Sequence, residues 1–138
     1  MSIVQTQTTS FKKELYQAVH NLSTDTIKIA LYTGNADLNE ATTVYSATNE
    51  VSGTGYTAGG ETMTGVAISS SGYVAYANWA NVSWTAALTA RCALIYNVTQ
   101  GNKSIAVLDF GSDKTSTTTF TITMPANTST TALIRSSN

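Results

Sequence analysis

The sequence contains few of the residues on which most site chemistry depends. It has one cysteine, Cys92, and one histidine, His20, so neither an internal disulfide nor a metal site built on two histidines is available. A pairing of nucleophile and base is equally hard to assemble from this set. We therefore expect no catalytic residues, no metal and no cofactor, and we expect the protein not to be an enzyme.

Charge is scarce as well. Charged residues make up only 11% of the chain, against about a quarter in ordinary soluble domains, and the formal net charge is -1. A nucleic-acid partner is not expected, because binding phosphates requires several unopposed cations. A surface so poor in charge has little protection against association. It therefore suits a protein that lies permanently against other polypeptides.

Long apolar runs are also missing. The most apolar stretch, residues 86–96, is interrupted by Thr89 and Arg91 and falls well short of a bilayer span. The first ten residues show neither the basic region nor the apolar region of a secretory signal. These features predict no membrane partner and synthesis in the cytoplasm. A length of 138 residues corresponds to a single domain.

Small hydroxyl side chains are abundant, with 25 Thr and 15 Ser. Thr is β-branched and favours a pleated, half-exposed surface. Hydroxyl and apolar residues alternate over 117–124, and two alternating segments, 90–96 and 104–110, flank a turn-like sequence at 99–102. About eight short strands with frequent turns predict a mainly β fold. We expect an antiparallel β-sandwich or barrel, with strands from about residue 26 to 135.

The N-terminal region differs from the rest. Residues 1–10 are polar and predict an extended arm, ordered against a neighbour, ahead of a single domain over 11–138. An apolar stripe at helical spacing predicts one amphipathic helix over about 11–22, with Ser10 as its N-cap. In such a helix His20 lies opposite the stripe, as an ordinary surface residue.

A glycine-rich segment follows at 53–60. Gly53-Thr54-Gly55-Tyr56-Thr57-Ala58 matches the spacing of a dinucleotide-binding turn. A β-like segment over 62–68 follows it in place of the helix that phosphate binding requires, so we interpret it as a loop. Glycines there allow sharp bends or the close approach of another backbone. Tyr56 at its centre is a candidate anchor for a partner surface.

Aromatic residues gather between Tyr73 and Trp84. Core packing is the first interpretation of Trp79 and Trp84, and a partly exposed interface patch or sugar platform is the alternative. Only Asn78 and Asn81 are near enough in sequence to orient sugar hydroxyls, which favours an interface over a sugar platform. Cys92 alternates in phase with Leu94 and Tyr96, so we expect a small apolar side chain on one face of a sheet.

Several strings of the sequence resemble small virion proteins of tailed bacteriophages. They run in order along nearly the whole chain: SFKKELYQAVHNL, DTIKIALYTGNADL, TTVYSATNEVSGTGYTAGG, ALIYN, AVLDFG and IRSSN. The resemblance implies a β-rich structural protein, chiefly a capsid decoration or cement protein located on the capsid surface. It also implies the major capsid protein and copies of itself as partners, with a trimer as the usual arrangement.

The function we expect is therefore non-enzymatic reinforcement of contacts between major capsid subunits. The partner-binding candidates are the arm with Ile3 and Val4, the loop with Gly53, Gly55 and Tyr56, and the aromatic residues Tyr76 and Trp79. The alternative is a tail or head-fibre component with a carbohydrate-binding or host-binding role. Only in that alternative is a glycan a partner.

Overall fold

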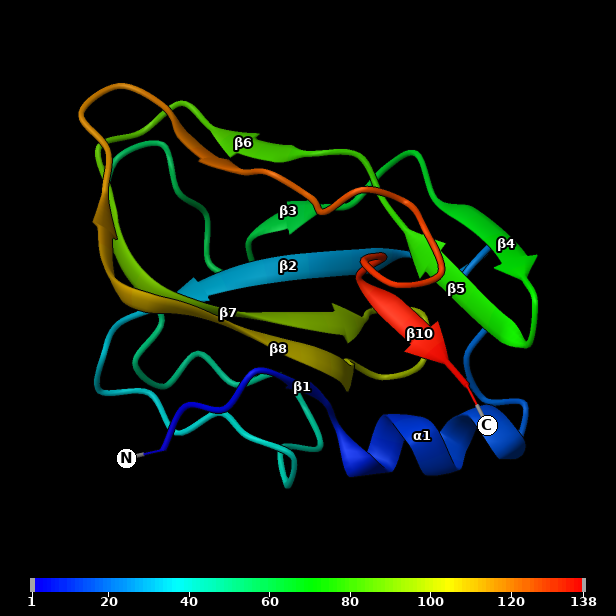
Figure 1. The fold of residues 1–138 in the computed structure, drawn as a ribbon. Helices are drawn as coiled ribbons and strands as arrows, with labels where there is room; N and C mark the ends of the chain where they lie inside the picture. Colours follow the sequence, from blue (N-terminus) through cyan, green and yellow to red (C-terminus); the bar gives the residue numbers. More distant parts are fainter. Residues whose placement is uncertain (1, 138) are drawn as a thin grey trace.

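A computed structural model describes residues 2–137 as a mainly β structure with antiparallel sheets and one short helix near the N-terminus. The predicted fold class is confirmed. The largest sheet has the order β1-β8-β7-β2-β3, a second sheet has the order β10-β5-β4, and β6 pairs with β9 (Figure 1). The elements are β1 (Thr6–Gln7), α1 (Thr9–Tyr16), β2 (Ile27–Tyr32), β3 (Glu61–Thr62), β4 (Ala67–Ser71), β5 (Val74–Asn78), β6 (Val82–Trp84), β7 (Thr89–Asn97), β8 (Lys103–Thr115), β9 (Phe120–Ile122) and β10 (Ile134–Ser136).

The main core lies between the five-stranded sheet and the two smaller sheets. Alternate residues of β2, Ile27, Ile29 and Leu31, face this core. They share it with Trp84 of β6 and with Trp79, which lies between β5 and β6. In β9 only Phe120 and Ile122 are buried and Thr121 is exposed, as the alternation of hydroxyl and apolar residues predicts. Trp79 and Trp84 are thus core residues.

A second, smaller core covers the other face of the large sheet. Ala30, Tyr32, Cys92 and Leu94 point into it, and the loop between β2 and β3 closes it with residues such as Leu38. Figure 1 shows this loop, coloured cyan to green, running beside β7 and β8. Because the large sheet is covered on both faces, β2 and β7 are almost continuously apolar. Cys92 is fully buried and free, as expected for a small apolar side chain.

The helix is shorter than its apolar pattern predicts. It begins at Thr9, with Thr8 rather than Ser10 as the N-cap, and ends at Tyr16 rather than near residue 22. The end is a Schellman motif, in which the Val19 N–H donates to the Glu14 carbonyl and the Ala18 N–H to the Leu15 carbonyl. Ala18 adopts a φ of 58° there, which stops the helix. Among the described residues, no helix has the length and apolarity needed to cross a membrane.

The N-terminal arm lies on its own domain. Thr6 and Gln7 pair with Val107 and Ala106 of β8, so the arm forms the edge strand β1 of the large sheet. The expectation that the arm is ordered against a neighbour is therefore corrected for residues 2–8. The free edge of β8 is the physical reason, because it offers unpaired backbone groups within reach of the arm.

Candidate functional site

The glycine-rich segment is held in place by a single carboxylate. Glu50, in the turn just before it, accepts hydrogen bonds from the hydroxyls of Tyr45 at 2.6 Å and Tyr56 at 2.5 Å. It also accepts the backbone N–H of Gly59 at 2.8 Å. One side chain therefore joins the middle and the C-terminal part of the segment to the loop that covers the second core.

Tyr56 lies inside the domain, with its ring 6.0 Å from that of Trp84. Its hydroxyl donates to Glu50 and accepts the backbone N–H of Leu31 at 2.9 Å. Burial, followed by the bond to Glu50, raises the pKa of Tyr56 well above its ordinary range. The side chain is a neutral hydrogen-bond donor that fastens the segment to β2.

The glycines allow the chain's own backbone to come close. At Gly60, with φ of 80°, a Cβ atom would lie 1.8 Å from the carbonyl oxygen of Ile29, and at Gly55, with φ of 91°, it would lie 2.4 Å from that of Thr85. Both positions require glycine for space and for backbone conformation. The close approach predicted for this segment therefore occurs within the domain.

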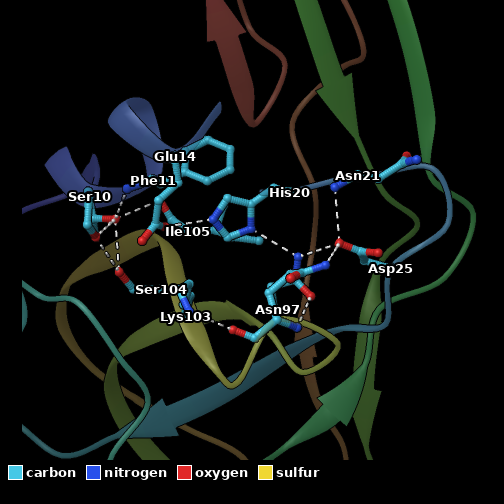
Figure 2. Close-up of polar contacts among 12 residues, drawn as sticks. Ser10, Phe11, Glu14, His20, Asn21, Asp25, Asn97, Lys103, Ser104 and Ile105 are labelled. Carbon is cyan, nitrogen blue, oxygen red and sulfur yellow. Dashed lines mark hydrogen bonds and ion pairs between the residues drawn. The ribbon is translucent and has the colours of Figure 1, made fainter. Parts of the chain in front are cut away.

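A second polar cluster surrounds His20, which is buried rather than on the surface. Figure 2 shows the ring between Glu14 and Asn97. Nε2 lies 2.8 Å from Glu14 Oε1, and Nδ1 lies 3.0 Å from the amide nitrogen of Asn97. The same amide nitrogen lies 2.8 Å from Asp25 Oδ2. The surface position predicted for His20 is wrong because the helix ends at Tyr16 and the chain turns inward.

The hydrogen bonds define the roles in this cluster. Asn97 Oδ1 accepts the N–H of Gln100 at 3.3 Å, so its amide nitrogen faces His20 and Asp25. His20 Nδ1 then accepts, and Nε2–H donates to Glu14. Burial acts to raise the pKa of Asp25, but hydrogen bonds from Asn97 and from the Asn21 backbone outweigh it and lower the pKa. Both ring nitrogens are thus used in joining the end of α1 to the end of β7.

A third cluster links the arm to the sheet. Thr8 is fully buried, its hydroxyl lies 2.9 Å from that of Ser104, and it accepts the N–H of Phe11 as the helix cap. The Ser104 hydroxyl donates to the Thr42 carbonyl at 2.8 Å. In the described part of the chain, no group of three or more His, Cys, Asp or Glu side chains is arranged to hold a metal ion.

The predicted partner-binding residues lie in different environments. Trp79 is only 5% exposed and Tyr56 is buried, so neither ring forms an exposed surface of this chain. Ile3 packs against the second core, whereas Val4 is 40% exposed. Gly53 and Gly55 are exposed, and Tyr76 is half-buried on β5. The structure places these residues on separate elements, since Ile3 and Val4 lie beside Leu38 of the loop between β2 and β3, whereas Tyr76 lies in the sheet β10-β5-β4.

Two of the exposed large apolar residues lie on the β4–β5 hairpin, while others, such as Tyr16 and Val44, lie on α1 and in the loop between β2 and β3. Every residue of β4 is exposed, Ile68 on it is 55% exposed, and Tyr73 at the turn is 94% exposed. One sequence signal points to this region, since no charged residue occurs between Glu61 and Arg91. Glu50, Asp25 and Asn97 were also missed. A single carboxylate directly before a glycine-rich segment is the only sequence signal for Glu50.

Comparison with known proteins identifies no relative of this chain. No protein-family model, no curated protein and no solved structure matches the chain significantly.

Proposed function

We propose that this chain is a non-enzymatic structural protein of a tailed-phage virion, which decorates the capsid and stabilises contacts between major capsid subunits. The observation that carries the proposal is the exposed, uncharged region that includes β4 and the turn at Tyr73. Exposed surface without charge suits contact with other polypeptides. The assignment to a virion rests on the resemblance of the sequence strings to small virion proteins of tailed bacteriophages.

The use of the polar residues supports the same proposal. Glu50, His20 and Thr8 each bond to groups of the chain itself and fix a loop, a helix end and the arm. Such side chains make the domain rigid. A rigid module binds an assembled lattice without a large ordering cost.

Stabilisation follows from mass action. A protein that binds the assembled shell but not free subunits stabilises the shell, and the stabilisation grows as its free concentration rises relative to its Kd. The exposed candidates for that contact are Val4, the Gly53–Gly55 turn and the region around Tyr73. They replace the buried Tyr56 and Trp79 among the contact candidates.

The test is the number of copies per particle. Phage particles purified on a density gradient are analysed by quantitative mass spectrometry, with the major capsid protein as the internal standard. Decoration predicts hundreds of copies that remain bound through a second gradient. A handful of copies would instead indicate the tail or fibre role, and absence from purified particles would overturn the virion assignment.

Capsid stability provides the second arm of the test. Particles stripped of the protein should release their DNA at a lower temperature than complete particles, and adding the purified chain should restore the difference. Equal release temperatures would remove the stabilising role while leaving the location intact.

A further inference from the structure

The β4–β5 hairpin carries a free sheet edge. β4 is the last strand of the sheet β10-β5-β4, and no strand of the described chain pairs with its outer side. All five residues of β4 are exposed. Figure 1 shows the hairpin at one end of the molecule, beyond the core between the sheets.

The turn of the hairpin determines which backbone groups are free. Ser71 and Val74 are Cα partners, and only Gly72 and Tyr73 lie between them. Gly72 has a φ of 59°, whereas Tyr73 does not have a positive φ, as in a type II′ turn. In such a hairpin the pair beside the turn exchanges both of its backbone hydrogen bonds.

Bonded pairs alternate along an antiparallel ladder, so every second residue of β4 bonds to β5. Counting from Ser71, the backbone groups of Ile68 and Ser70 point outward. Their side chains lie on one face of the sheet. Ala77 and Ile134 are on the same face, because Ile68 pairs with Ala77 and Ala77 pairs with Ile134. The edge therefore offers backbone donors and acceptors together with one large apolar side chain.

This edge lacks the usual protection. Monomeric proteins protect free edges with charged side chains, proline or a bulge. β4 has the sequence Ala-Ile-Ser-Ser-Ser and pairs with β5 in unbroken register. The nearest charged residues in sequence are Glu61 and Arg91, outside the hairpin.

We propose that β4 pairs antiparallel with β4 of a second copy of this chain about a two-fold axis. Self-pairing suits the edge because its backbone groups complement themselves and no like charges are brought together. With Ser69 at the axis, Ile68 lies opposite Ser70 of the other copy, and the two Ile68 side chains are diagonal neighbours on one face. The two three-stranded sheets then form one continuous sheet.

The contact is small. A strand of five residues covers less area than the roughly 1,000 Å² that a stable, specific interface needs. The pair should therefore form weakly in dilute solution and more fully where copies are already held close together. This inference rests on the sheet edge alone and does not depend on the proposed function.

The first test replaces Ser70 by proline. Ser70→Pro removes an outward N–H and leaves the bonds to β5 in place, since proline is tolerated at the outer side of an edge strand. Sedimentation velocity over a wide concentration range should show a dimer for the natural chain and a monomer for the variant, with unchanged circular dichroism. A natural chain that is monomeric at every concentration would overturn the proposal.

The second test identifies the partner. Ser70→Lys and Ser70→Glu each place like charges diagonally across the axis and should weaken self-association about fivefold. An equimolar mixture of the two variants should regain it, because only the mixed pair has opposite charges. Failure of the mixture to dimerise more tightly than either variant would contradict self-pairing of β4.

A matched control excludes the other open edge. Ser112 is exposed on β8, so Ser112→Lys adds the same charge to a different strand. It should leave dimerisation unchanged. Loss of the dimer in this variant, with no effect of the Ser70 variants, would place the contact on β8 and overturn the proposal. Copy number in the virion is measured independently, so either proposal can fail without the other.

Discussion

The hydroxyl of Tyr56 donates a hydrogen bond to Glu50 at 2.5 Å and accepts one from the backbone N–H of Leu31 at 2.9 Å. Glu50 lies before the glycine-rich segment, Tyr56 lies in its middle, and Leu31 belongs to the central strand β2. The hydrogen bonds of Tyr56 to Glu50 and to Leu31 thereby hold the glycine-rich segment against the main core.

Removing this hydroxyl should destabilise the fold. Tyr56→Phe leaves the buried Leu31 N–H without an acceptor and removes one donor from the Glu50 carboxylate, at a cost of about 2 kcal/mol. Denaturant unfolding measures the loss. Tyr73→Phe is the control, because Tyr73 is almost fully exposed and should change the free energy of unfolding by little. Equal effects at the two positions would contradict the anchoring role.

Gly60 should tolerate no side chain. Gly60→Ala places a Cβ atom against the Ile29 carbonyl and is expected to cost about 3 kcal/mol or more. Gly101→Ala is matched in backbone conformation, with a φ of 73°, but has no atom within 4 Å of the added Cβ. It should cost only about 1 kcal/mol. Similar losses for the two variants would mean that Gly60 does not lie against β2 in this way.

Ala18→Gly should stabilise the protein. Ala18 has a φ of 58° at the end of α1, where glycine adopts the left-handed conformation without strain. The expected gain is about 1 kcal/mol in the free energy of unfolding. Ala87→Gly, at an exposed position without a positive φ, should instead cost about 0.5 kcal/mol. A loss at Ala18 would refute the Schellman ending.

Stability should fall at alkaline pH. Burial raises the pKa of Tyr96 from 10.0 to about 12 and that of the Cys92 thiol from 9.0 to about 11. These groups ionise in the unfolded chain before they ionise in the folded one, so their contribution is complete below about pH 9 and is lost as the pH rises toward 12. Unfolding measured from about pH 8 to pH 11 should show this decline. A constant free energy of unfolding above pH 9 would contradict the burial of both groups.

Local sequence patterns predicted the β elements well, because period-two alternation directly reflects a strand with one buried face. The hairpin of β7 and β8, the alternation in β9 and the core positions of Trp84 and Cys92 follow from that rule, whereas Trp79 lies between strands and its burial does not. The end of the helix could not be predicted from the sequence pattern. Its apolar stripe continues past Tyr16, and nothing in the pattern marks Ala18 as a residue with positive φ.

The clusters around Glu50 and His20 depend on tertiary structure. Glu50 meets Tyr45 and Tyr56 only because the segment folds back over β2, and His20 meets Asn97 across 77 positions of sequence. The docking of the arm on β8 is likewise a contact between distant segments. Residue type and local spacing do not indicate which distant segments come into contact, so these contacts could not be predicted from the sequence.

Cryo-electron microscopy of the intact phage particle, at a resolution that separates subunits, is the decisive test of capsid decoration by this chain. We expect this two-layered β domain to lie on the outer surface of the capsid lattice, across junctions between major capsid subunits. A particle whose capsid carries no such density, with the protein absent or confined to another part of the virion, would contradict it.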